Sequence, residues 1–150
     1  MSTALHLARI ERLCARKFPT QPGRSDLCLG GPGYHVAELG VDGSPAEPEA
    51  ADDPALRESV VEQCEAEREG LTELLTARWG EPDTIGLGGV LLRTLEYGED
   101  IPEPWASLSA RVPDVQLWHT AGRWVALGVA RLDPAQPPCL VATVTDIDPP

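Results

Sequence analysis

Apolar residues recur every three or four positions in two segments of the chain. The first segment ends at Phe18, which precedes a proline, and it predicts an amphipathic helix over residues 4–17. The second begins at Asp53, a residue type that caps helices, and it predicts a helix of about seven turns that ends at Trp79. Gly70 lies inside this second segment and costs about 1 kcal/mol relative to alanine, so a kink or a break into two helices stays open.

The C-terminal third has a different pattern, in which β-branched, aromatic and apolar runs are separated by turn residues. These runs predict an antiparallel meander. Weaker patterns predict short strands over 34–39 and 83–87 and a short helix over 90–97. Because strands and helices do not alternate regularly, the sequence predicts an α+β fold, with an N-terminal helix and a long central helix packed on a C-terminal antiparallel sheet of three to four strands. The meander runs are residues 115–119, 123–132 and 139–146.

Two stretches rich in glycine and proline predict loops. Residues 21–33 would connect the first helix to the first short strand. Residues 43–54 carry three prolines, four acidic residues and no large apolar side chain, so they cannot offset the entropy that ordering costs. We therefore expect a single domain over residues 1–150, with a flexible acidic Pro-rich loop at 43–54.

The first hairpin of the meander bears on function, because its turn decides which side chains share a face. A three-residue loop over 120–122 would place Trp118 opposite Trp124. Both tryptophans would then lie on the face that carries the small residues Ala126 and Gly128. This register predicts a shallow aromatic surface suited to a ligand or to a partner's side chain.

Acidic residues concentrate in the middle of the chain. The net charge is −12, which opposes direct binding to nucleic-acid phosphates and favours basic partners. Five glutamates of the long predicted helix recur at helical spacing and would form one stripe. The first predicted helix carries Arg9, Arg12 and Arg16 instead, which would either pair internally with the stripe or face an external partner. The stripe consists of Glu58, Glu62, Glu65, Glu69 and Glu73.

The remaining composition favours a cytoplasmic location. The four cysteines form no CxxC pair, so we expect reduced thiols. No stretch approaches the roughly 20 apolar residues that cross a bilayer, so no membrane association is expected. Lys17 is the only lysine, and the abundance of alanine, glycine and proline is typical of GC-rich bacterial coding.

Known catalytic and metal-binding motifs are missing from the sequence. It has no GxSxG elbow, HExxH helix or Walker loop. The candidate ligands, which include Cys28 and His6, match no zinc spacing, so we expect no metal or other cofactor. An alternative stays open, in which a small-ligand-binding domain or modest hydrolase has a pocket around His35, His119 and Cys139.

The pattern of charge and the missing motifs predict a non-catalytic acidic module that binds another protein. The most specific form of this hypothesis is an immunity or antitoxin-like inhibitor that covers a basic enzyme such as a nuclease. The glutamate stripe would steer and dock the basic partner, while Trp118 and Trp124 would supply a desolvated anchor. A homo-oligomer that associates through the tryptophan face is a further form of the same hypothesis.

Overall fold

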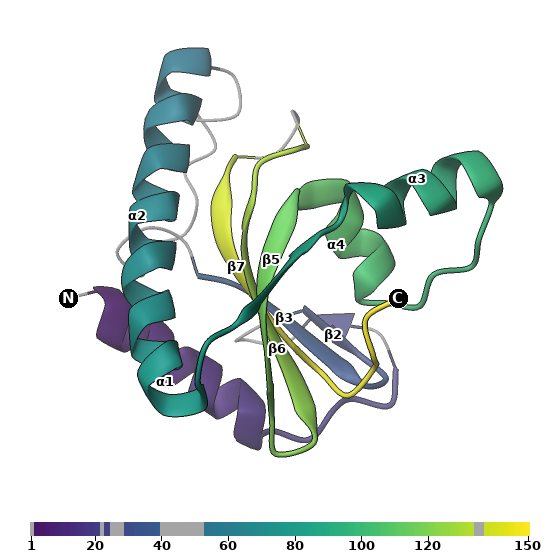
Figure 1. Ribbon diagram of the computed structural model, residues 1–150, viewed down its shortest axis with the longest axis horizontal. Helices are drawn as coiled ribbons and strands as arrows, with labels where there is room; N and C mark the ends of the chain where they lie inside the picture. Colours follow the sequence, from purple (N-terminus) through teal and green to yellow (C-terminus); the bar gives the residue numbers. More distant parts are fainter. Residues whose placement is uncertain (1, 22, 25–28, 40–52, 134–136) are drawn as a thin grey trace.

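An antiparallel sheet with helices on both faces forms the fold (Figure 1). The structure is a computed structural model, and it describes residues 2–21, 23–24, 29–39, 53–133 and 137–150. Helices and antiparallel strands occupy separate layers, which confirms the predicted α+β fold. The predicted flexible loop lies outside the described residues as far as residue 52.

Four helices in the described part of the chain flank the sheet, two on each face (Figure 1). The N-terminal helix and the long central helix lie together on one face, close to the bounds predicted from the sequence. The two shorter helices lie on the other face. In chain order they are α1 (Ser2–Ala15), α2 (Pro54–Trp79), α3 (Gly88–Tyr97) and α4 (Trp105–Arg111).

Local signals explain where α2 begins and ends. Asp53 Oδ1 accepts hydrogen bonds from the backbone N–H groups of Ala55 and Leu56 at 3.0 and 3.3 Å, which satisfies two donors of the first turn. Gly80 follows the last turn with a φ of 88°, a conformation that favours glycine. Between these points α2 runs through Gly70 as one helix, so the alternative of two helices is wrong. Although α2 is long, neither it nor any other helix among the described residues is apolar enough to cross a bilayer.

The sheet has seven strands within the described residues, more than the three to four predicted. They are β1 (Gly23–Arg24), β2 (Leu29–Gly31), β3 (Tyr34–Glu38), β4 (Asp83–Gly86), β5 (Asp114–Thr120), β6 (Arg123–Ala130) and β7 (Cys139–Thr145). Their spatial order is β1-β2-β3-β7-β6-β5-β4, with every neighbouring pair antiparallel. β1 and β2 lie in the stretch predicted as a loop, because pairing with β3 makes short strands of glycine-rich segments that have no strand propensity of their own.

The β5–β6 hairpin has a different register from the predicted one. Its loop has two residues, 121–122, whose positive φ values of 52° and 77° are those of a type I′ turn. Trp118 therefore pairs with Val125, and Trp124 pairs with His119. A shift of one residue moves a side chain to the other face of a sheet. The predicted pairing of Trp118 with Trp124 is therefore wrong, and the two lie on opposite faces.

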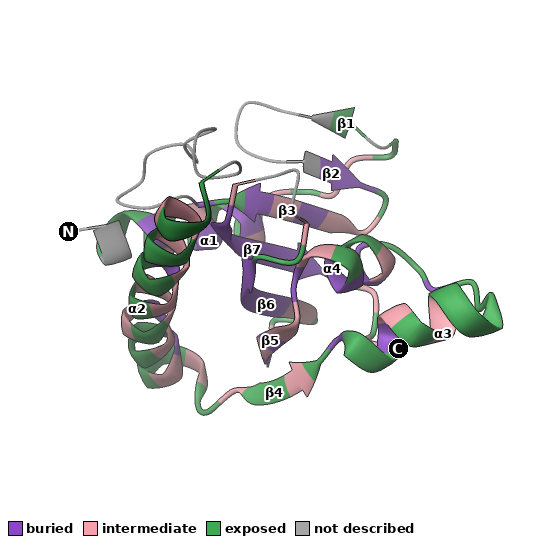
Figure 2. Cartoon of the chain, turned by 90° about the horizontal axis from the view of Figure 1, so that it is seen from above, coloured by how far each residue is buried: buried purple, intermediate pink, exposed green. Residues whose placement is uncertain are grey.

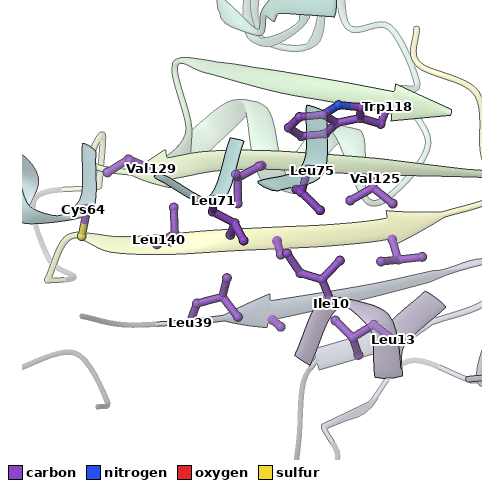
Figure 3. Close-up of a cluster of buried hydrophobic side chains, with 14 residues drawn as sticks. Ile10, Leu13, Leu39, Cys64, Leu71, Leu75, Trp118, Val125, Val129 and Leu140 are labelled. Atoms are coloured by element: carbon purple, nitrogen blue, oxygen red, sulfur yellow. The ribbon is translucent and has the colours of Figure 1, made fainter. Parts of the chain in front are cut away.

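Each face of the sheet has its own hydrophobic core. Beneath α1 and α2, the side chains of Leu71, Leu75 and Trp118 meet apolar residues of the central strands (Figure 3). Beneath α3 and α4, the second core includes the fully buried Trp105. β7 lies between the two cores, and all of its residues are buried (Figure 2). Cover on both faces explains why this strand is a nearly continuous apolar run.

Candidate binding site: an acidic groove along α2

A groove of about 860 Å³ runs along α2, between the helix and Gln116 of β5. The structure places all five glutamates of the predicted stripe in its lining. The arrangement follows from the helical repeat, because residues three and four positions apart share one side of a helix. The opposite side of α2 buries Cys64, Leu71 and Leu75 against the sheet, so the acidic side is turned away from that core (Figures 2 and 3).

Arg68 holds the floor of the groove in place. Its Nε donates to Gln116 Oε1 at 3.1 Å, and an Nη donates to Asp114 Oδ1 at 3.0 Å. Thr72 Oγ1 donates to the same Gln116 oxygen at 2.6 Å, while Glu65 lies 3.8 Å from the guanidinium. The Arg68 side chain is only 12% exposed. These contacts join α2 to β5 and give the groove a polar, fixed floor.

Negative charge dominates the groove. Its described lining includes five carboxylates and two guanidinium groups, those of Arg68 and Arg131. Arg68 already pairs with Asp114, which lies at the floor beside Gln116. Four of the five glutamates are exposed, and Glu65 is partly buried. A concave surface with excess carboxylates concentrates cations and slows the approach of anions.

The basic side of α1 does not close this groove in the contacts that the structure describes. Between the two helices, an ion pair joins Arg78 of α2 to Glu11 of α1, and a hydrogen bond of 3.2 Å joins His6 Nε2 to Glu67 Oε2. Both pairs use residues outside the groove lining. Arg9 and Arg12 instead line a small depression beside Ala37 of β3. Among the described contacts, none joins Arg9 or Arg12 to a glutamate of the stripe.

The two predicted anchor tryptophans have separate environments. Trp118 is 2% exposed, and its Nε1 donates to the Gly80 carbonyl oxygen at 2.9 Å. Trp124 lies on the other face, where it stacks on His119 at a ring distance of 4.2 Å and donates to Asp148 Oδ1 at 3.0 Å. The two rings therefore form no common surface, and Trp118 has no free area for a partner.

The residues of the predicted small-ligand pocket are also far apart. His35 is buried on the α1 side, where it contacts Phe18 at a ring distance of 5.1 Å. Burial lowers the pKa of His35. His119 lies on the opposite face of the sheet, opposite Trp124 in the ladder.

Cys139 occupies the far end of that face. It pairs with Ala130, six residues along β6 from Trp124, which corresponds to roughly 20 Å. Burial raises the pKa of Cys139 to about 11, although the nearby Arg111 guanidinium opposes this shift. A buried neutral thiol is a weak nucleophile. The pocket expected around His35, His119 and Cys139 is therefore not formed.

Sequence reasoning missed the residues that complete the groove on the side of the sheet, namely Arg68, Thr72, Gln116 and Arg131. One signal was present. Gln116 is a polar residue between the apolar residues Val115 and Leu117. The register of β5 places it on the same face as the buried Trp118, where a polar side chain needs hydrogen-bonding partners.

The described residues contain no group of three or more His, Cys, Asp and Glu side chains that could hold a metal ion. Cys28 lies outside these residues. No family model, curated protein or solved structure matches the chain.

Proposed function

We propose that the chain is a non-catalytic protein-binding module that holds a basic surface of its partner in the acidic groove. The observation that carries this proposal is the lining of the groove, where five glutamates of one helix lie along one side of a fixed polar floor. The volume of about 860 Å³ is large enough for several side chains of a partner. Arginine and lysine are the side chains that complement such a surface.

The carboxylates would act mainly on association. A field of like charges steers an oppositely charged protein toward the groove and raises the association rate, an effect that salt screens. Once docked, a guanidinium could form two parallel hydrogen bonds to a carboxylate, which fixes its orientation. The Arg68 network would keep the floor unchanged during docking, so little ordering entropy is lost there.

The specific form that we favour is an immunity or antitoxin-like inhibitor of a basic enzyme such as a nuclease. Enzymes that bind nucleic acid carry basic clefts, because they must neutralise phosphates. A groove lined with carboxylates would compete for such a cleft. The overall charge of −12 supports the same assignment.

Charge-neutralised variants with matched net charge test the proposal. Glu69→Gln/Glu73→Gln removes two charges from the groove, and Glu96→Gln/Asp100→Asn removes two from exposed positions at and after the end of α3. Fluorescence anisotropy would measure the affinity of each variant for an arginine-rich peptide and for a glutamate-rich peptide of equal length. We expect the groove variant to weaken arginine-peptide binding by roughly three- to tenfold, and the control variant to leave it nearly unchanged. Equal losses in both variants would sink the proposal, because they would reflect net charge alone.

A further inference from the structure

β4 forms an edge of the sheet, and its position suggests how a partner binds. It pairs with β5 on one side and has no strand on the other side among the described residues. Three of its four residues are exposed, and Figure 2 shows the strand at the periphery of the molecule. An exposed strand edge presents unpaired backbone N–H and C=O groups to any extended chain.

The hydrogen-bond pattern identifies which residues present these groups. Leu87 N donates to the Pro113 carbonyl oxygen, immediately after β4. In an antiparallel ladder such bonds recur at every second residue, so Ile85 and Asp83 direct their backbone groups toward β5. Thr84 and Gly86 therefore direct theirs outward, to the free edge.

The β5–β6 turn independently indicates which backbone groups of β5 face β4. A two-residue hairpin loop is closed by a hydrogen-bonded pair, here Thr120 and Arg123. Hydrogen-bonded pairs recur at every second residue, so Trp118 and Gln116 also form backbone hydrogen bonds to β6. Leu117, which lies between them, therefore directs its backbone groups toward β4.

The free edge lies next to the acidic groove. Thr84 pairs with Gln116, so it lies about 4.8 Å beyond the groove floor on the same face of the sheet. Gly86 pairs with Asp114, which accepts a hydrogen bond from Arg68. A strand added beside β4 would thus direct every second side chain to the face of the sheet on which α2 and its glutamates lie.

The opposite face of β4 has a different character. Ile85 is partly buried and packs against the apolar core beneath α3 and α4. Alternate residues of an added strand would therefore lie toward the glutamates of α2 on one face. On the other face they would lie beside Ile85 and, at the start of β4, beside the exposed Asp83. This pattern selects a segment in which basic and apolar residues alternate.

We propose that the partner binds as an extended segment with alternating basic and apolar residues, which adds a strand to β4 and directs its basic side chains into the acidic groove. The inference rests on the proposed function and specifies the conformation of the ligand. A basic helix would satisfy the glutamates but leave the outward groups of Thr84 and Gly86 unpaired. A second copy of this chain is disfavoured as the occupant, because edge-to-edge pairing at β4 would bring two acidic grooves together.

The first experiment uses a peptide of alternating arginine and valine, made in two N-methylated forms. One form is methylated at the arginines and the other at the valines. Because alternate residues of a strand direct their N–H groups to opposite edges, only one form loses the donors that face β4. We expect that form to bind at least tenfold more weakly than the unmethylated peptide. The other form should bind with the same affinity as the unmethylated peptide. Equal affinities of the two forms would overturn strand addition.

A second experiment changes the protein. Thr84→Pro removes an outward N–H without removing a bond to β5, and proline is tolerated at such edge positions. Thr84→Val retains the N–H and serves as the control. We expect Thr84→Pro to weaken binding of the alternating peptide by about tenfold and Thr84→Val to leave it unchanged, with amide exchange at Thr84 and Gly86 slowed by the peptide in the unmodified protein.

The outcomes separate the two proposals. Binding that responds to Glu69→Gln/Glu73→Gln but is equal for the two methylated peptides would retain the acidic groove and reject the added strand. Binding that responds to neither change would reject both proposals. If Thr84→Pro lowers the stability of the protein, the methylated peptides still decide the question on the unmodified chain.

Discussion

The two tryptophans of the β5–β6 hairpin differ in surroundings, although their positions in the ladder are adjacent. Trp118 lies under α2, donates to Gly80 and contacts Trp79 edge-on at a ring distance of 6.3 Å. Trp124 lies under the C-terminal segment, stacks on His119 and remains partly exposed. The hairpin tryptophan on the α1–α2 face is therefore part of the core, whereas the hairpin tryptophan on the α3–α4 face stays near the surface.

A single turn determines on which face of the sheet the side chains of β6 lie relative to those of β5. The loop at 121–122 fixes the register of β5 against β6, and this register decides which tryptophan is buried. Gln116 lies two residues before Trp118 in β5, so it shares the face of Trp118 in either register and forms the floor of the acidic groove. The two-residue loop therefore decides that Trp124 lies on the opposite face from Trp118 and Gln116.

The largest expected effect comes from deleting the buried tryptophan. We expect Trp118→Ala to lower the free energy of unfolding by about 3–5 kcal/mol, because it leaves a cavity between β5 and α2. Urea denaturation would measure the change. Trp118→Phe retains most of the ring volume and loses mainly the bond to the Gly80 carbonyl, so it should cost clearly less. Equal losses in the two variants would contradict the role of packing.

The buried thiol of Cys64 should make stability depend on alkaline pH. Burial raises the pKa of Cys64 to about 12 from an ordinary value of 9.0. Above pH 9 the unfolded chain releases a proton that the folded chain retains, so stability falls as the pH rises toward the folded value, with a slope approaching about 1.4 kcal/mol per pH unit. Urea denaturation between about pH 8 and pH 11 would reveal a shallower slope in Cys64→Ala. Identical slopes of stability against pH in the two proteins would show that the Cys64 thiol is not shielded from solvent in the folded state.

The partly exposed tryptophan should matter less than the buried one. We expect Trp124→Ala to cost about 1–2 kcal/mol, because part of the ring remains in water and its Asp148 partner can be solvated after the change. The same denaturation series would measure it. A loss as large as that of Trp118→Ala would erase the contrast between the two faces.

The smallest expected effect concerns the turn itself. Ala121 has a φ of 52°, a conformation that asparagine adopts more readily than alanine. We expect Ala121→Asn to raise the free energy of unfolding by no more than about 1 kcal/mol, because Asn-Gly suits a type I′ turn. Thermal unfolding would detect this change, and a lower melting temperature would argue against the two-residue loop.

The sequence predicts elements well where the signals are local. The cap at Asp53, the apolar stripe and Gly80 are all contained in the segment that forms α2, so its bounds were predictable. The register of the β5–β6 hairpin was not predictable, because Thr120-Ala121-Gly122 also suits a three-residue loop that has glycine at its left-handed position. Ala121 carries none of the usual preference for a type I′ turn, so nothing local distinguishes the two registers.

The same distinction applies to the candidate site. The shared side of the five glutamates follows from helix periodicity alone, and the structure places them together. The floor depends on how α2 packs against β5, which lies far from it in the sequence, so Gln116 and Asp114 could be assigned to it only from the structure. β1 and β2 were missed for a related reason, since their pairing depends on β3 and not on their own glycine-rich residues.

The place of β7 in the sheet has a consequence for synthesis of the protein on the ribosome. β3 pairs with β7, so an early strand waits for a partner that emerges about a hundred residues later. The end of α1 waits as well, because Arg123 donates to the carbonyl oxygens of Leu13 and Arg16. Nascent chains that stop before β7 should therefore expose the apolar side of α1 and recruit chaperones, and native structure should form late, after the C-terminal third has left the exit tunnel.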